Sequence, residues 1–303
     1  MRYIFLSLLL AIAALGSALL ENFYTESGTL LSLVQEKGVA PYLIAAPLIG
    51  ALVLWTAPGS VGRFARLYAM RPTLAVRGFM VTFALGLAIP LALSIVLALA
   101  GQAGWGPNAQ LGRMNVLLHS TVAAFLLACV VAIPEEMLFR GFLVSYLRSN
   151  SSPTATMAAI LFSALIFALA HNLRDPFAWF APGEIPLLVG LFLLGVLLAI
   201  TYLATRSLWG PIGLHVALVM FDLAILQGGV LRIDLSPWWL GGGNDIREAP
   251  ALWAAFCIAS IAIIGARQRL QNRLAIEPFV GILTLPSSPS ATAVGPLAHN
   301  RLS

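Results

Sequence analysis

Residues 115–141 read NVLLHSTVAAFLLACVVAIPEEMLFRG, and this stretch combines an apolar run with a group of ionisable side chains. The part from 115 to 134 is apolar and long enough to cross the hydrocarbon of a bilayer, which takes about 20 helical residues. Two adjacent glutamates, Glu135 and Glu136, follow it directly, and Arg140 comes four residues after the second. The stretch therefore predicts a membrane helix that ends in a group of ionisable side chains.

The composition of the whole chain agrees with a membrane protein. Of its 303 residues, 60% are hydrophobic and 10% are charged, whereas a soluble domain carries about 25% charged residues. This composition argues against a secreted, cytosolic or disordered protein. The net charge of +5 does not indicate nucleic acid as a partner, because the basic residues lie between apolar runs without an interleaved aromatic patch. Cys129 and Cys257 lie in apolar runs without C-x-x-C spacing, which argues against a thiolate zinc site or a disulfide framework.

Apolar runs recur along the chain and predict an all-α, polytopic transmembrane bundle of about eight spans, because hydrocarbon leaves no water for unpaired backbone groups. The runs cover residues 4–20, 40–57, 78–100, 115–134, 154–171, 186–204, 209–228 and 250–265. With the N-terminus inside, most basic residues fall in cytoplasmic segments: Arg2, Arg63, Arg66, Arg71, Arg77, Arg140, Arg148, Arg206, Arg267, Arg269, Arg273 and Arg301. By the positive-inside rule, we expect a multi-pass protein of the plasma (inner) membrane with both termini in the cytoplasm.

Four regions are predicted from this layout. Residues 1–114 supply about three N-terminal spans, and residues 115–228 supply about four spans that contain the ionisable groups. Residues 229–266 form an outer loop and the last span, and residues 267–303 form a basic segment followed by a disordered cytoplasmic tail. The first apolar run also resembles a signal peptide, but we expect it to be retained as an anchor.

Ionisable residues inside or beside apolar runs are costly in a membrane, so each is a candidate functional residue. On a helix, Glu136 and Arg140 share a face and can form an ion pair, whereas Glu135 points about 140° away from Arg140. Glu135 is therefore the carboxylate available to act as a base. The alternative is that this stretch only carries a solvated salt bridge.

Two histidines on later helices are predicted to meet Glu135. A hairpin that turns near residues 151–152 brings His171 level with Glu135, and His215 joins them if the hairpin projects about 15 Å into the cytoplasm. The expected result is one layer of Glu135, His171 and His215 in a polar cavity open to the cytoplasm. Each histidine alone would also fit a structural role as a hydrogen bond between helices.

Two further ionisable residues are weaker candidates. His119 lies about 24 Å from Glu135 along the same helix and is expected to be structural. Asp222 shares a face with His215 about 10 Å deeper, where it would either bond within the bundle or bind substrate.

The motifs Glu135-Glu136-x-x-x-Arg140, Phe167-x-x-x-His171 and His215 resemble the CPBP family of intramembrane proteases, which includes the type II CAAX prenyl endopeptidases and bacteriocin-processing relatives. The resemblance implies eight helices around a cavity that faces the cytoplasm, and hydrolysis of a peptide bond near the membrane surface. It implies that Glu135, assisted by His171, activates water, that Glu136 and Arg140 brace the site, and that His215 stabilises the oxyanion.

One position departs from the pattern that the resemblance implies. The family has an asparagine four residues after the last histidine as a second oxyanion donor, and this chain has Val219 there. Loss of such a donor costs on the order of a hundredfold or more in rate. Asn172 or water would have to replace it, or the protein would be slow or inactive.

Other functions are compatible with the same residues. Glu135, His171 and His215 have the chemistry of three zinc ligands with an open position for water, although no cofactor is favoured because Arg140 lies beside them. A non-catalytic relative, such as an immunity factor, a scaffold or a transporter subunit, is the alternative from another class. For an enzyme, the expected partners are a membrane-anchored protein or peptide substrate and the lipid bilayer.

Overall fold

The computed structural model describes residues 72–110, 114–148, 152–171, 183–240 and 246–273. Six of the predicted apolar runs fall in these ranges, and each is helical. The long helices are α5 (Pro72–Leu99), α7 (Met114–Glu136), α9 (Pro153–Ala170), α10 (Ile185–Thr205), α11 (Trp209–Phe221) and α12 (Pro250–Arg273). The predicted runs at 4–20 and 40–57 and the predicted tail at 285–303 lie outside the described residues.

Helices of membrane-spanning length and composition confirm a multi-pass membrane bundle. Five stretches of the described residues qualify: Val76–Leu99, Pro153–Ala170, Ile185–Thr205, Trp209–Leu226 and Pro250–Arg269. The number of eight spans remains a prediction. α12 continues to Arg273, so the last helix is longer than the predicted run that ended at residue 265.

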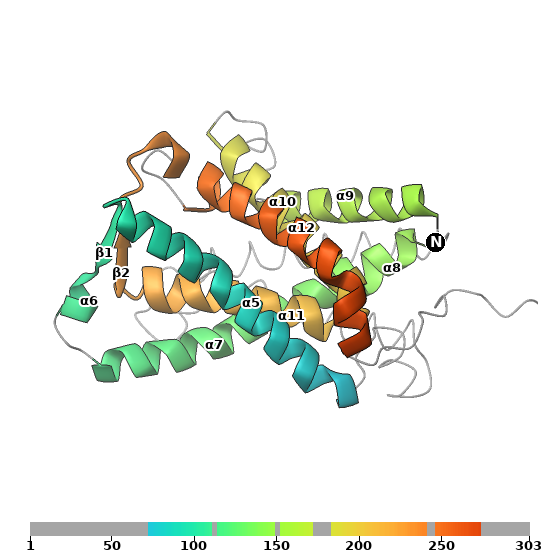
Figure 1. Cartoon of the computed structure of the whole chain (residues 1–303), viewed down its shortest axis with the longest axis horizontal. Helices are drawn as coiled ribbons and strands as arrows, with labels where there is room; N and C mark the ends of the chain where they lie inside the picture. Colours follow the sequence, from blue (N-terminus) through green and yellow to red (C-terminus); the bar gives the residue numbers. More distant parts are fainter. Residues whose placement is uncertain (1–71, 111–113, 149–151, 172–182, 241–245, 274–303) are drawn as a thin grey trace, which may run out of the picture.

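The long helices form two layers (Figure 1). α11 packs against α5 and α7 in one layer, α10 packs against α9 and α12 in the other, and α10 also contacts α11. Small residues allow close approach, as is usual between membrane helices. A methyl group at Gly86 of α5 would lie 2.6 Å from the carbonyl oxygen of Leu214 on α11, and one at Gly195 of α10 would lie 2.9 Å from Cα of Ala164 on α9.

The link from α7 to α9 is helical but not uniformly α-helical. α7 continues without a break into the π-helix η1 (Met137–Val144) and then into the short α8 (Ser145–Leu147). α9 begins at Pro153, where the hydroxyl of Ser152 accepts a hydrogen bond from the backbone N–H of Ala155. In Figure 1, α8 and the start of α9 extend beyond the ends of α11 and α12, as expected for a projecting hairpin.

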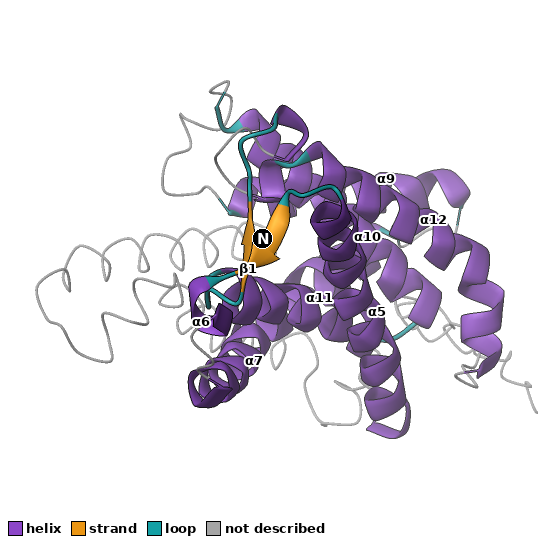
Figure 2. Ribbon diagram, turned by 60° about the vertical axis from the view of Figure 1, so that its left-hand side comes forward, coloured by secondary structure: helices purple, strands orange, loops and turns teal. Residues whose placement is uncertain are grey.

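A short antiparallel strand pair, which the all-α prediction did not include, closes one end of the bundle (Figure 2). β1 (Ala103–Trp105) pairs with β2 (Leu231–Ile233), with Gly104 opposite Arg232. The remaining short elements are α6 (Pro107–Gln110), the π-helix η2 (Asp222–Leu226) and the 3₁₀ helices η3 (Trp238–Leu240) and η4 (Ile246–Glu248). The strands are only three residues long, so their sequence lacks the alternation that would identify them.

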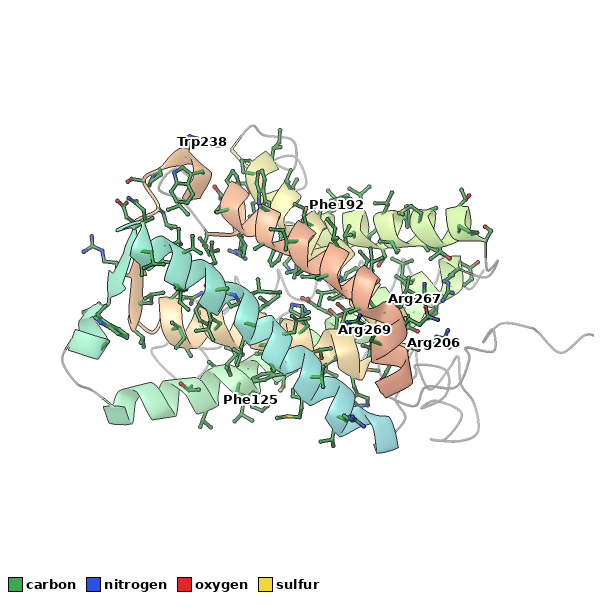
Figure 3. All side chains as sticks on the ribbon, in the orientation of Figure 1. Phe125, Phe192, Arg206, Trp238, Arg267 and Arg269 are labelled. Carbon is green, nitrogen blue, oxygen red and sulfur yellow. The ribbon has the colours of Figure 1, made fainter. Side chains whose placement is uncertain are left out.

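The charges of the bundle differ between its two ends. Arg206, Arg267 and Arg269 lie together at one end, and Trp238 lies at the other (Figure 3). Arg148 belongs to the same basic end. Burial lowers the pKa of Arg148, Tyr202 opposes this shift, and the positive charges of Arg267 and Arg206 lower it further.

Candidate active site

The site is built where α7 changes into the π-helix η1. Glu135 and Glu136 are the last residues of α7, and Arg140 lies inside η1. π-helical turns are rare in proteins overall, and those that occur often lie at functional sites. Two hydroxyl groups hold this turn: Ser163 of α9 donates to the carbonyl oxygen of Phe139 at 3.0 Å, and Ser145 donates to that of Arg140 at 3.3 Å. The wide turn is thereby fixed to the neighbouring helix α9.

Glu136 and Arg140 form a fully buried ion pair, as the i,i+4 spacing predicted. Nη1 of Arg140 lies 2.9 Å from Oε1 of Glu136, and both side chains have 0% exposure. Nη2 of Arg140 donates a second hydrogen bond to the carbonyl oxygen of Gly195 at 3.0 Å. The guanidinium carbon also lies 4.6 Å from the centre of the Phe167 ring, within the range of a cation–π contact. One arginine therefore links η1, α9 and α10.

His215 is held by the same glutamate. Its Nδ1 lies 2.9 Å from Oε1 of Glu136, and because a carboxylate only accepts hydrogen bonds, Nδ1 carries the proton. Oε1 of Glu136 therefore accepts from both Arg140 and His215. The other ring nitrogen of His215, Nε2, lies 3.7 Å from Oε2 of Glu135. His215 is thus placed between the two adjacent carboxylates.

His171 approaches Glu135 from the end of α9. Its Nδ1 lies 2.8 Å from the carbonyl oxygen of Phe167. Since a carbonyl only accepts, this nitrogen is the donor, and Nε2 is the unprotonated nitrogen of the neutral ring. Nε2 lies 3.8 Å from Oε1 of Glu135. The side chain of His171 is 23% exposed, against 9% for Glu135, so Glu135 is more accessible from the side of His171.

Glu135, Glu136, Arg140, His171 and His215 are called the site layer from here on. The sequence predicted that the Glu135 carboxylate and the His215 imidazole would lie no more than about 10 Å apart, and Oε2 of Glu135 lies 3.7 Å from Nε2 of His215. Phe167 lies beneath the layer, with ring centres 4.5 Å from His171 and 6.0 Å from His215. The aromatic ring fills the space between the two imidazoles.

Sequence reasoning missed two groups that support this layer. The carbonyl oxygen of Gly195 accepts from Arg140, and the hydroxyl of Ser163 fixes the π-helical turn. Both lie in uninterrupted apolar runs. A glycine or serine in a membrane helix more often serves close packing, so the sequence carried no signal that separates these roles.

The other candidate residues lie elsewhere. Val219 is half-buried and packs in an apolar cluster with Ile212 and Val216. Asp222 begins η2 and accepts a hydrogen bond from Gln227 at 2.7 Å. The side chain of His119 and the whole of Asn172 lie outside the described residues.

A metal centre needs several ligating side chains arranged around one point. In the described part of the chain, no three His, Cys, Asp or Glu side chains are arranged to hold a metal ion. Arg140 and His215 both bind Oε1 of Glu136. The zinc alternative for Glu135, His171 and His215 stays a prediction.

Comparison with known proteins identifies the segment that contains the site. No curated protein and no solved structure matches the chain significantly. The family model described as type II CAAX prenyl endopeptidase Rce1-like matches residues 117–221. This range contains all five residues of the site layer, and it confirms the resemblance predicted from their motifs. Residues 117–221 of this chain are therefore similar to the Rce1-like family of type II CAAX prenyl endopeptidases.

Proposed function

We propose that this protein is an intramembrane endopeptidase that hydrolyses a peptide bond of a membrane-anchored protein or peptide, with Glu135 as the general base. The observation that carries the proposal is the position of the Glu135 carboxylate, whose two oxygens lie 3.8 Å and 3.7 Å from Nε2 of His171 and Nε2 of His215. The family match supports a membrane protease. The roles of single residues rest on the geometry and on general chemistry.

Glu135 and His171 are suited to activate a water molecule. Oε1 of Glu135 and the unprotonated Nε2 of His171 are both acceptors and stand 3.8 Å apart, too far for a direct hydrogen bond and suited to a bridging water. A water that donates one proton to each acceptor presents its oxygen lone pair to a carbonyl carbon. Glu135 then takes one proton and later returns it to the leaving amine.

His215 is suited to stabilise the oxyanion of the tetrahedral intermediate. In the doubly protonated form, Nδ1–H is held by Glu136 at 2.9 Å, and Nε2–H points to the side of Glu135 where the carbonyl oxygen would lie. A charged donor forms a hydrogen bond about twice as strong as a neutral one. A positive His215 would therefore offset part of the loss caused by Val219 at the position where the family has asparagine.

Glu136 and Arg140 act on the reaction through position. Glu136 fixes the ring of His215, and Arg140 fixes Glu136 and ties it to the backbone of Gly195. Such partners hold a catalytic group in its productive orientation. Both side chains are fully buried and have no access to substrate.

We further propose that the reaction needs no metal ion. Arg140 supplies a positive charge beside Glu136, and water activation is assigned to Glu135 and His171. Dialysis of the purified protein against a zinc chelator is therefore expected to leave its turnover unchanged. Loss of activity that is restored by added zinc would contradict this part of the proposal.

The proposed orientation places the basic end of the bundle in the cytoplasm of a cell with an inner membrane. The layer is then reached from that side, because His215 is only six residues from the start of α11 at Trp209, about 9 Å along the helix. A substrate held in the membrane by a lipid anchor or a helix can present an extended segment at this depth.

The decisive experiment replaces Glu135 by Gln, which keeps the size of the side chain and removes the base. Cells that express the wild type or Glu135→Gln are compared by mass spectrometry of the new protein termini in their membrane fraction. The wild type is expected to generate termini that are absent with the variant, and Glu184→Gln, at the start of α10, serves as the matched control. An identical set of termini for wild type and Glu135→Gln, at equal expression, would overturn the proposal.

A further inference from the structure

Asp222 lines a cavity that has no residue in common with the site layer. The cavity has a volume of about 410 Å³, and its polar lining consists of Asp222, Gln227 and Arg232. Asp222 lies within the candidate membrane span Trp209–Leu226. An ionisable residue inside a span is costly and almost always faces the bundle interior or a polar cavity, where it serves a function. Asp222 accepts a hydrogen bond from Gln227 at 2.7 Å, and its place on the cavity wall makes its carboxylate a candidate to bind a ligand as well.

The wall of the cavity is a fixed structure. η2 begins at Asp222, and the backbone N–H of Gln227 donates to the carbonyl oxygen of Asp222 at 2.9 Å. The chain then turns at Gly229, whose φ of +65° suits glycine, and enters β2. Gly106 donates its N–H to the carbonyl oxygen of Val230 at 2.8 Å, and a methyl group at Gly106 would collide with the carbonyl oxygen of Gly229. The two crossing segments therefore hold the cavity open in one shape.

The cavity lies at the level of lipid headgroups. The span that contains Asp222 ends at Leu226, another residue of the cavity wall. Trp105 of β1 is 71% exposed, and Trp238 of η3 is 77% exposed. Exposed tryptophans gather at the interface between membrane and water. Trp238 also lies at the opposite end of the bundle from Arg206, Arg267 and Arg269 (Figure 3).

Charges of both signs line this cavity beside apolar side chains. Asp222 supplies a carboxylate, Arg232 supplies a guanidinium, and Leu226, Leu231 and Leu235 supply apolar surface. Arg232 also acts on Asp234, whose pKa is lowered mainly by hydrogen bonds from Ser236 and, to a smaller degree, by this arginine. A ligand that complements the whole lining carries a cation, an anion and an apolar part. A volume of about 410 Å³ is within the range of small-molecule sites.

We propose that this cavity binds the headgroup of a zwitterionic phospholipid with a primary amine, of the phosphatidylethanolamine class. Asp222 accepts hydrogen bonds from the ammonium group, and Arg232 donates to the phosphate, while the glycerol and the first acyl carbons contact the leucines. A primary ammonium has three N–H donors and a choline group has none, so the carboxylate distinguishes the two. Phosphatidylglycerol offers no cation to Asp222.

The test measures lipid binding by native mass spectrometry of the purified full-length protein in detergent. Phosphatidylethanolamine, phosphatidylcholine and phosphatidylglycerol with identical acyl chains are added at equal concentration. The wild type is expected to bind phosphatidylethanolamine most tightly. Its Kd should be about tenfold lower than that for phosphatidylglycerol, which is the difference that one charge-assisted hydrogen bond provides. Asp222→Asn should bind ethanolamine and choline lipids equally, and Arg232→Gln should weaken both.

Two matched variants control for general effects of charge. Asp234→Asn removes an aspartate of the same segment that is not part of the cavity lining, and Arg269→Gln removes an arginine at the opposite end; both should keep the wild-type order of lipids. Equal binding of all three lipids to the wild type, or an unchanged preference in Asp222→Asn, would overturn the proposal. If Asp222→Asn does not fold, the comparison of ethanolamine with choline on the wild type decides alone. Glu135→Gln should keep the lipid order, so the two proposals stand or fall separately.

Discussion

Replacement of Arg140 by Met tests the energetics of the site layer most directly. The change keeps an apolar side chain of similar length but leaves the Glu136 carboxylate, which has 0% exposure, without its strongest partner. Breaking a buried ion pair by removing one member costs about 3–5 kcal/mol, because the remaining charge stays desolvated. The carbonyl oxygen of Gly195 loses its bond from Nη2 in the same step. We expect a loss at the upper end of this range.

The free energy of unfolding is measured by titrating the purified protein in mixed micelles with a denaturing detergent and following tryptophan fluorescence. The double variant Glu136→Met/Arg140→Met removes both buried charges, so it should be more stable than either single variant. It should stay about 1–3 kcal/mol below the wild type, since Nδ1 of His215 loses its acceptor. Arg140→Lys keeps the positive charge but loses the forked guanidinium that reaches both Glu136 and Gly195. Its free energy of unfolding should lie between those of the wild type and Arg140→Met.

The double-mutant cycle decides whether the pair is coupled as its geometry indicates. Interaction energies between residues in one buried network are about 0.5–3 kcal/mol. If the two single losses simply add in the double variant, or if Arg140→Met costs less than about 1 kcal/mol, the assignment of Arg140 and Glu136 as one buried unit is wrong.

Three further predictions follow from the same structure. His171→Ala should lower turnover by about 10²-fold or more, as for loss of a general acid–base group. It should change the free energy of unfolding less than Arg140→Met does, because the His171 side chain is 23% exposed and that of Arg140 is 0% exposed. Kinetics and detergent titration of one preparation separate the two effects. Gly195→Ala should destabilise the protein, since the added methyl group would lie 2.9 Å from Cα of Ala164. Gly78→Ala should stabilise it by up to about 1 kcal/mol, because a methyl group there meets nothing within 4 Å. Equal effects of the two variants on thermal unfolding would contradict this packing. The proposed orientation is tested by labelling single cysteines with an impermeant thiol reagent in a cysteine-free background. Arg269→Cys should react only when the reagent reaches the cytoplasmic face, and Ser236→Cys only when it reaches the opposite face. Labelling of both cysteines from one face would refute the orientation.

The apolar runs predicted the helices because a membrane protein has few other ways to satisfy its backbone. In hydrocarbon, a run such as 186–204 has no partner for its amide groups except its own turns, and the structure has α10 at Ile185–Thr205. The i,i+4 spacing of Glu136 and Arg140 fixed their pairing in the same way, since neighbours on one helix face depend only on local geometry.

Tertiary contacts decide what the sequence did not show. A π-helical turn from Met137 to Val144 needs hydroxyl groups of other turns, such as Ser163, to satisfy its displaced carbonyl groups. The bond from Nδ1 of His215 to Glu136 rather than Glu135 depends on the rotation of α11 against α7, which no spacing within one helix specifies. β1 and β2 pair only because α5 and η2 end at the same side of the bundle.

The single oxygen Oε1 of Glu136, which accepts from both Arg140 and His215, restricts how this protein can change over evolutionary time. A substitution of Arg140 or of His215 changes the charge around the oxygen that the other residue also binds. Substitutions at these positions are therefore tolerated best when they occur in pairs. Drift at these three positions is therefore expected to be concerted, and an ancestral reconstruction that changes one of them alone should give a protein with a lower free energy of unfolding than one that changes them together.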